Sequence, residues 1–340
     1  MKALFIGGTG TISTEISKLC VSRGWELTLL NRGKTRDLVP EGAEIIVGDI
    51  HREDEVRTLL NGRVFDVVAD FIAFTTADVE RDIRLFEGKT KQYFFISSAS
   101  AYQKPLSSPW ITEGTPLHNP YWEYSRNKAA CERVLRDAYD DRGFPVTIIR
   151  PSHTYCERSM PLALHGPKGS WQVLDRILRD KPVIIPGDGA TLWTLTHSRD
   201  FAVAFAGLMG NVHAIGDTFH ITSDESLTWN QIHMSVAEAL GHELKPVYIP
   251  SDTIGRLYPD QIGGLTGDKS NTVIFDNSKI KRAVPEFLCT TRFADGAREC
   301  AAYILSHEEC RVPDPAFDAW CDKMIDAWDL AVSGFPRFAE

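Results

Sequence analysis

The sequence lacks the short patterns that usually build a metal site or a disulfide framework. Its seven cysteines form no C-x-x-C pair, and its ten histidines form no H-x-x-x-H or H-E-x-x-H group. We therefore expect no built-in metal ion. An odd number of scattered cysteines is typical of reduced thiols in a reducing compartment, mostly buried as small apolar residues.

Positive charge and long apolar runs are also scarce. Lys and Arg number 37 against 46 Asp and Glu, so the formal net charge is −9. This charge disfavours a nucleic-acid partner that binds through a broad positive surface. No apolar run is long enough to cross a bilayer, and the first residues do not follow the charged-then-apolar pattern of a leader. We therefore expect a cytoplasmic protein that has no membrane partner.

An apolar run and a glycine cluster open the chain. Residues 2–6 have the composition of a parallel strand covered on both faces, and glycines follow directly. A helical period and a second strand over residues 27–30 come next. Glycines at such a turn let the backbone approach a pyrophosphate, and the helix offers free N–H groups and its positive dipole end. An ordinary strand-to-helix turn is the alternative, but the order of elements favours a dinucleotide cradle formed by Gly7, Thr9, Gly10, Thr11 and Ile12.

Two details modify this prediction. Ser13 stands where the third glycine of the dinucleotide fingerprint is expected, so helix and strand are expected to pack less closely there. The second strand ends in Asn31 and Arg32, without the acid that binds the ribose of NAD. A permanently charged guanidinium at this position favours the 2′-phosphate of NADP. The alternative for Arg32 is a solvated turn residue.

The ends of the next two strands carry acidic side chains. A third strand over residues 43–47 leads to Asp49. We expect this carboxylate either to accept a hydrogen bond from the adenine amino group or to cap the following helix. A fourth strand over residues 65–71 leads to Asp70, Phe71, Ile72 and Ala73, which are predicted to line the floor of the cofactor site.

A serine-rich turn follows a fifth strand over residues 93–96. A hydroxyl at this edge is expected to hydrogen-bond a substrate oxygen, although such turns are also common in loops. The three hydroxyls of this turn are those of Ser97, Ser98 and Ser100, and Ser97 is predicted to contact the cofactor.

A helix predicted over residues 121–140 carries Tyr124 and Lys128. Residues four apart lie on one face of a helix, so the phenol and the ammonium project together. The ammonium stabilises the phenolate and moves the phenol pKa from about 10 toward neutral pH, which makes the tyrosine a usable acid and base. A single Y-x-x-x-K match is nonspecific. Its order after the glycine turn, the aspartate and the serine turn is more informative.

This ordered set resembles the short-chain dehydrogenase/reductase superfamily, in its extended branch of NAD(P)-dependent epimerases and dehydratases. The matching positions are Gly7, Gly10, Ile12, Asp49, Ile50, Ser98, Tyr124, Lys128, Arg150 and Pro151. Within the branch, the chain looks most similar to atypical members that include the chloroplast stem-loop-binding proteins. Cys156 and Trp193 depart from the pattern. Trp193 stands near where sugar-nucleotide enzymes carry an arginine, which puts a UDP- or dTDP-linked substrate in doubt.

The resemblance implies an α/β fold, a doubly wound parallel (Rossmann) sheet with a smaller mixed C-terminal substrate lobe. We place the NAD(P)-binding domain at residues 1–160 and the lobe at residues 161–340, with segments around 190–225 returning to the first domain. Pro151 and His153 follow the sixth strand and are expected to contact the cofactor, His153 near the nicotinamide. A satisfied loop histidine is the alternative for His153. Candidate substrate residues in the lobe are His165, Trp171 and Trp193, and the two tryptophans could equally pack in the core.

The resemblance also implies an activity. Tyr124 exchanges a proton with a substrate hydroxyl or carbonyl, Lys128 lowers its pKa and holds the nicotinamide ribose, and Ser98 steadies the substrate oxygen. We expect a sugar or sugar derivative as substrate, and either dehydrogenase or epimerase chemistry. The alternatives are a non-catalytic dinucleotide-binding or RNA-associated protein, and an NADPH-dependent reductase of a non-sugar carbonyl. A homodimer is expected by analogy with related dimers.

Overall fold

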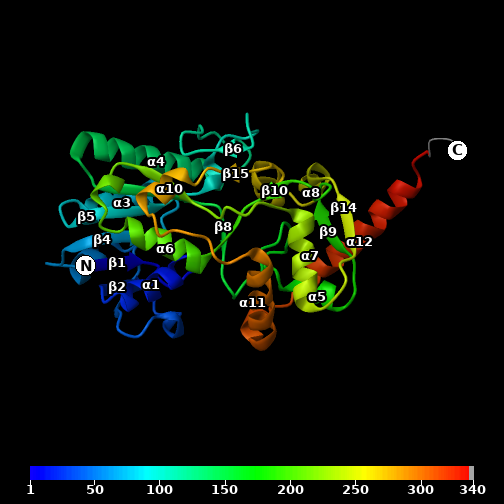
Figure 1. Cartoon of the computed structure of the whole chain (residues 1–340), viewed down its shortest axis with the longest axis horizontal. Coiled ribbons are helices and arrows are strands. Elements are labelled where there is room, and N and C mark those ends of the chain that lie inside the picture. Colours follow the sequence, from blue (N-terminus) through cyan, green and yellow to red (C-terminus); the bar gives the residue numbers. More distant parts are fainter. Residues whose placement is uncertain (337–340) are drawn as a thin grey trace. The chain divides into compact units, whose positions relative to one another are not determined.

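The computed structural model describes residues 1–336, and a seven-stranded parallel sheet forms its largest element (Figure 1). The strand order is β12-β7-β5-β4-β1-β2-β3, so the chain winds outward in both directions from β1. This topology confirms the predicted doubly wound parallel sheet. The strands are β1 (Lys2–Ile6), β2 (Glu26–Asn31), β3 (Glu44–Val47), β4 (Phe65–Asp70), β5 (Thr90–Ile96), β7 (Val146–Pro151) and β12 (Thr218–Ile221).

Helices cover both faces of this sheet because successive strand residues point to opposite sides. In β1, Ala3 and Phe5 belong to one buried cluster, and Leu4 and Ile6 belong to the other. The first cluster includes residues of α1 (Ser13–Ser22), α6 (Ser198–Leu208) and α10 (Ser278–Ala283). The second includes residues of α2 (Glu53–Leu59), α3 (Thr76–Phe86) and α4 (Glu123–Arg142). Both faces of the sheet are therefore core, which explains why its strands are apolar throughout.

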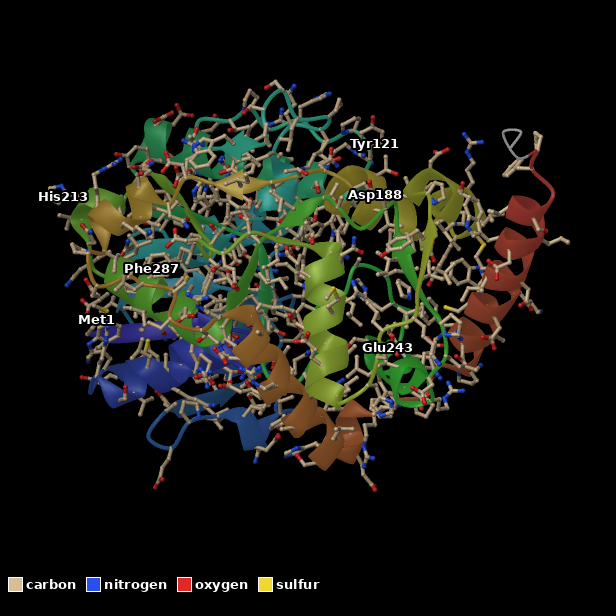
Figure 2. The ribbon with its side chains drawn as sticks, turned by 45° about the vertical axis from the view of Figure 1, so that its right-hand side comes forward. Met1, Tyr121, Asp188, His213, Glu243 and Phe287 are labelled. Carbon is tan, nitrogen blue, oxygen red and sulfur yellow. The ribbon has the colours of Figure 1, made fainter. Side chains whose placement is uncertain are left out.

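Contacts along the chain divide it into two compact units. The first consists of Met1–Tyr155, Thr194–Asp224 and Val273–Thr291. Besides the large sheet it contains the pairs β6 (Trp110–Ile111) with β15 (Ile274–Phe275) and β8 (His153–Tyr155) with β11 (Leu195–His197), and the short helices η1 (Arg36–Leu38), η2 (Ala99–Ala101) and η3 (Val212–Ala214). Phe287, labelled in Figure 2, is buried in the same cluster as α1 and α6.

The second unit consists of Cys156–Trp193, Glu225–Thr272 and Arg292–Glu340. It holds a parallel strand pair and an antiparallel one, among helices, and this is the mixed secondary structure expected of the lobe. The sequence-based domain boundaries stay a prediction. The elements are α5 (Trp171–Leu178), β9 (Val183–Pro186), β10 (Leu192–Trp193), β13 (Leu227–Thr228), α7 (Trp229–Leu240), β14 (Pro246–Ile249), α8 (Ser251–Leu257), α9 (Gln261–Gly264), η4 (Leu265–Lys269), α11 (Phe293–Ser306), η5 (Glu308–Cys310) and α12 (Pro315–Ser333).

Two kinds of feature are absent from residues 1–336. None of the helices there combines the length and the apolar character that crossing a bilayer requires. The same residues contain no group of three or more His, Cys, Asp or Glu side chains placed to hold a metal ion.

Candidate active site

The turn between β1 and α1 requires glycine at two successive positions. Gly7 has a φ of +80°, and a Cβ there would lie 2.7 Å from Cγ2 of Ile72. A Cβ on Gly8 would lie 2.5 Å from Cδ2 of Leu29. The backbone can therefore pass this close to the neighbouring side chains only without side chains of its own.

Hydroxyl groups of α1 hold this turn in place. Ser13 Oγ donates a 2.7 Å hydrogen bond to the carbonyl of Gly7 and accepts one of 2.8 Å from the amide of Gly10. Ser17 Oγ donates to the carbonyl of Gly8 at 2.9 Å. Ser13 is buried, so the serine that replaces the third glycine bridges the turn instead of loosening the contact between helix and strand. Such a fixed turn is the geometry that a phosphate cradle needs.

A cavity of about 490 Å³ opens next to this turn, beyond the carboxyl ends of β1, β2 and β3. It is the position at which open parallel sheets bind ligands. The cavity brings together predicted residues from four segments, namely Gly7, Thr9, Gly10, Asn31, Arg32, Asp49 and Ile50, with the loop after β4. It is also lined by Ile72, which the sequence analysis predicted at the floor of the site, and by residues that it missed, which are Lys34, Thr35, His51 and Phe74.

The cavity fits the adenosine half of a dinucleotide. Asn31 presents a buried amide nitrogen that makes no hydrogen bond to any described residue. An unpaired buried donor is costly unless a ligand accepts its hydrogen bond. Arg32 and Lys34 add two positive charges to the same wall. The residues present thus suit a ligand with hydroxyl and phosphate groups.

Asp49 does not cap the helix that follows it. The residue before α2 is Arg52, and no side chain caps that helix. The Asp49 carboxylate instead accepts hydrogen bonds from the side chain of His51 at 2.9 Å and from its amide at 3.1 Å. These bonds, with the charge of Arg32, lower the pKa of Asp49. The carboxylate therefore stays ionised at the cavity rim, where it can accept a further hydrogen bond.

Asp70, the last residue of β4, and Phe71, which follows it, were predicted at the floor of the site but do not line this cavity. Asp70 is fully buried, accepts a 2.6 Å hydrogen bond from the amide of Ile72, and pairs with Arg81. Burial and the neighbouring carboxylate of Asp82 raise the pKa of Asp70. Phe71 packs edge-on against Phe5, with ring centroids 5.4 Å apart. Both residues hold the loop, and the wall itself is formed by Ile72 and Phe74.

The serine turn after β5 divides into buried and accessible hydroxyls. Ser97 is buried and donates a 2.6 Å hydrogen bond to Glu132, which Arg150 holds at 2.6 and 2.9 Å. Ser100 is also buried, with its Oγ 2.9 Å from that of Ser98. Ser98 is half-buried. Of the three serines, Ser98 is therefore the one that a substrate can reach.

Helix α4 delivers Tyr124 and Lys128 to the same edge of the sheet. It begins after Trp122 and ends at Arg142, two residues beyond the predicted end, because the left-handed backbone of Gly143 terminates it. Lys128 Nζ donates hydrogen bonds to the carbonyls of Ala73 at 2.6 Å and Ile96 at 2.7 Å. Burial lowers the pKa of this lysine to about 8. Its ammonium lies 5.7 Å from the centroid of the Tyr124 ring, so the charge faces the phenol's own ring.

Aromatic rings surround the predicted acid/base pair. The Lys128 ammonium lies 4.4 Å from the ring centroid of Phe74, which is 46% exposed. Tyr124 is half-buried, and its ring centroid lies 5.0 Å from that of Trp122. Tyr121, labelled in Figure 2, is also exposed just before the helix. The helical spacing indicated Tyr124 and Lys128, but it could not indicate these rings because they come from other segments or lie before the helix.

The segment after β7 contributes structure at this edge. Pro151 is the last residue of β7 and pairs with Ile221 in the sheet. His153 opens the short strand β8 and pairs with Leu195. The approach of His153 to a nicotinamide stays a prediction.

The predicted substrate residues of the second unit differ in accessibility. Trp193 is 3% exposed and stacks on the buried Trp229, with centroids 5.6 Å apart, which is the core packing that the sequence left open. Trp171 is half-buried at the start of α5. The Nδ1 atom of His165 lies 2.8 Å from the carbonyl of Gly166, and burial lowers the pKa of this histidine. Substrate contacts by these residues stay predictions.

A sequence model of the NAD dependent epimerase/dehydratase family matches residues 3–221. The match includes the glycine turn, the strand ends beside the cavity, and helix α4. The chain therefore belongs to this family, and the prediction of an NAD(P)-dependent enzyme is confirmed.

Individual proteins resemble the chain more distantly. It is 26% identical over 252 residues to the 2′-dehydrokanamycin reductase of Streptomyces kanamyceticus, a match that covers 74% of this chain and 70% of that protein. It is 28% identical over 253 residues to the chloroplast stem-loop binding protein of 41 kDa b of Arabidopsis thaliana, covering 71% of this chain and 63% of that protein, which is less than two thirds of its length.

A solved structure shares the fold. The UDP-glucose 4-epimerase of Thermus thermophilus, in complex with NAD, has a TM-score of 0.68 at 20% identity, and the match covers 90% of this chain and 99% of that chain. At this identity the likeness shows the fold alone.

Proposed function

We propose that the protein transfers a hydride between NAD(P) and a carbon of a sugar or sugar derivative, with Tyr124 as the acid and base. The observation that carries this proposal is that Tyr124 and Lys128 both lie beside Phe74, a residue of the cavity wall. Ser98 is connected to the same helix through the hydroxyls of Ser100 and Ser125. The likeness to a protein named as a reductase of a dehydrokanamycin supports the sugar class of substrate.

Each residue has a chemical role in this proposal. Bound NAD(P) supplies or takes the hydride. The Tyr124 phenol gives its proton to the carbonyl oxygen as the hydride arrives, and it takes a proton from a hydroxyl in the reverse direction. The Lys128 ammonium stabilises the phenolate that forms. Ser98, the accessible serine, donates a hydrogen bond to the reacting oxygen and stabilises the charge that develops on it.

We further propose that the cofactor is NADP. The tip of β2 carries Asn31 in place of an acid, and Arg32, Lys34 and Thr35 line the cavity beside it. A guanidinium and an ammonium together suit a 2′-phosphate, because a fork of N–H donors and a point charge both favour phosphate oxygens. The Asp49 carboxylate can accept a hydrogen bond from the adenine amino group.

RNA association is a second candidate function. One observation favours it, the likeness to a chloroplast protein named for stem-loop binding. The net charge of −9 argues against binding through phosphate contacts. A filter-binding titration with a stem-loop RNA at about 50 mM and about 200 mM salt tests it, because such binding weakens steeply with salt. Tight, salt-sensitive binding would favour this candidate, and no binding at the lower salt would remove it.

Two assays test the main proposal. Mass spectrometry of the nucleotide released on denaturation separates a reductase, which exchanges its cofactor, from an epimerase, which keeps NAD in place. Loss of NADPH or NADH absorbance is then followed with a panel of keto-sugars, 2′-dehydrokanamycin among them, and simple dicarbonyl compounds. We expect empty protein and NADPH-dependent reduction of a keto-sugar. Stoichiometric NAD would contradict the NADP assignment, and no turnover of any panel member would contradict the reductase direction.

A further inference from the structure

We propose that Ser125 is a positioning residue that acts through Ser100 to direct the Ser98 hydroxyl toward the substrate. This inference rests on the proposed function, because it concerns how Ser98 is held. It also gives Ser100 a supporting role, since the structure buries the hydroxyl that the sequence offered as a substrate contact.

The three hydroxyls form a line from helix α4 to the end of β5. Ser125 Oγ donates a 2.7 Å hydrogen bond to Ser100 Oγ, which lies 2.9 Å from Ser98 Oγ. Ser125 is 1% exposed and Ser100 is 4% exposed, whereas Ser98 is half-buried. Water is thus kept from the first two hydroxyls, and the line opens to the outside only at Ser98.

A count of hydrogens gives this line a direction. Each serine hydroxyl has one hydrogen to donate and two lone pairs to accept. Ser125 donates to Ser100, whereas either hydroxyl of the Ser100 and Ser98 pair can be the donor. Because Ser100 is buried and an undonated hydrogen there is costly, we infer that Ser100 donates to Ser98. Ser98 Oγ also accepts the amide of Ser100 at 3.2 Å. With both lone pairs occupied, Ser98 keeps its own hydrogen for a substrate oxygen, which is the polarity that charge stabilisation requires.

The backbone fixes the middle of the line. Asn119 Nδ2 donates a 2.8 Å hydrogen bond to the carbonyl of Ser100, within the short helix η2. Ser125 directly follows Tyr124 on α4. One helical turn therefore carries both the proposed proton donor and the start of the hydroxyl line, so the two groups that meet the reacting oxygen are positioned from one element.

Without the Ser125 hydroxyl, the orientation of the Ser100 hydrogen is no longer fixed. Ser100 can then donate elsewhere, and the Ser98 hydrogen is shared between Ser100 and the substrate. We expect Ser125→Ala to lower kcat about tenfold, the scale of one hydrogen bond to a charged oxygen. Ser100→Ala breaks the same line, so it should give the same loss and add nothing to Ser125→Ala. Ser125→Thr should restore most of the rate, because it keeps the hydroxyl.

A double-mutant cycle with Ser98→Ala tests the inference, using the panel compound that the wild type reduces fastest. If Ser125 acts through Ser98, then Ser125→Ala causes less than about a twofold further loss in the Ser98→Ala background. Additive losses, or a Ser125→Ala rate within about twofold of wild type, would overturn the inference. Ser198→Ala is the matched control, because Ser198 is a buried helical serine of the same unit whose hydroxyl has no hydrogen-bond partner among the described residues.

Two further readouts separate the possible failures. Melting temperature and NADPH affinity are measured for every variant, since a purely structural role for Ser125 would lower these together with kcat. Tyr124→Phe is assayed in the same series. Full activity of Tyr124→Phe would overturn the proposed function and this inference with it. An inactive Tyr124→Phe with additive serine losses would overturn the inference alone.

Discussion

Lys128 Nζ donates a 2.6 Å hydrogen bond to the backbone carbonyl of Ala73 and so connects helix α4 to the loop that follows β4. That loop also supplies Ile72 and Phe74 to the cavity wall. One lysine therefore links the predicted proton-transfer group to the predicted cofactor site. Its charge and its position are both needed for the proposed chemistry.

The pH dependence of reduction should report Lys128. Burial lowers the pKa of this lysine from the ordinary lysine value to about 8, so the ammonium is fully charged below this pH and is lost as pH rises through it. We expect kcat/KM for reduction to fall on the alkaline side with an apparent pKa near 8. A pH profile from mildly acidic to strongly alkaline buffer checks this. A profile that stays flat until the pH range of an exposed lysine would contradict the assignment.

Replacing Gly7 should weaken cofactor binding while the fold stays intact. Gly7→Ala places a Cβ 2.7 Å from Ile72 at a φ of +80°, so the loop that lines the cavity must move. Gly24→Ala is the matched control, since Gly24 has a φ of +72° and open space around it. Both variants lose about 1–2 kcal/mol from the left-handed backbone. Only Gly7→Ala should weaken NADPH binding, because only its Cβ pushes on a residue of the cavity wall. We expect at least about a tenfold loss in a fluorescence titration, which corresponds to about 1.4 kcal/mol.

The proposed preference for NADP depends on Arg32 and Lys34. Arg32→Ala should weaken NADPH binding by about 10- to 100-fold, because it removes a charged partner of the 2′-phosphate, and should leave NADH binding nearly unchanged. Lys34→Ala should act in the same direction. Arg52→Ala is a control of the same charge at an exposed position outside the cavity lining. Equal losses for the two cofactors would contradict the 2′-phosphate role.

Glu132→Ala should destabilise the first unit by about 3–5 kcal/mol, the cost of leaving a buried charge without its partner. Arg150 and Glu132 are 3% and 1% exposed at their side chains and lie 2.6 Å apart. Urea unfolding followed by circular dichroism measures the change. The double variant Glu132→Leu with Arg150→Met should recover most of the loss, because it buries no charge. A loss below about 1 kcal/mol for the single variant would show that water reaches the pair.

The strand positions and the shared face of Tyr124 and Lys128 could be predicted, because they depend on patterns within short stretches of sequence. The first strand was predicted at residues 2–6 and is Lys2–Ile6, because an apolar run that ends in glycines leaves little choice. Helical geometry placed Tyr124 and Lys128 on one face, and their order after the glycine turn, the aspartate and the serine turn singled them out. The strand ends were placed within a few residues, so the residues at the sheet edge could be named in advance.

What could not be predicted is where each side chain points and what fills the space beside it. Asp70 ends β4 and Asp49 follows β3, yet Asp70 is buried and pairs with Arg81, whereas Asp49 stays at the cavity rim. Lys34, His51 and Phe74 belong to no motif, and they meet only because three loops converge. The contact between Ser125 and Ser100 joins residues 25 positions apart. Such contacts depend on packing between elements, which sequence spacing does not encode.

The most direct test of the account compares hydride transfer in the wild type and in Tyr124→Phe, with NADPH and the panel compound that the wild type reduces fastest. General acid catalysis contributes about 100- to 10,000-fold, so we predict a loss of at least about 100-fold in kcat. NADPH affinity and melting temperature should stay close to wild type. A Tyr124→Phe enzyme with kcat within about threefold of wild type would contradict the central claim that Tyr124 moves the proton.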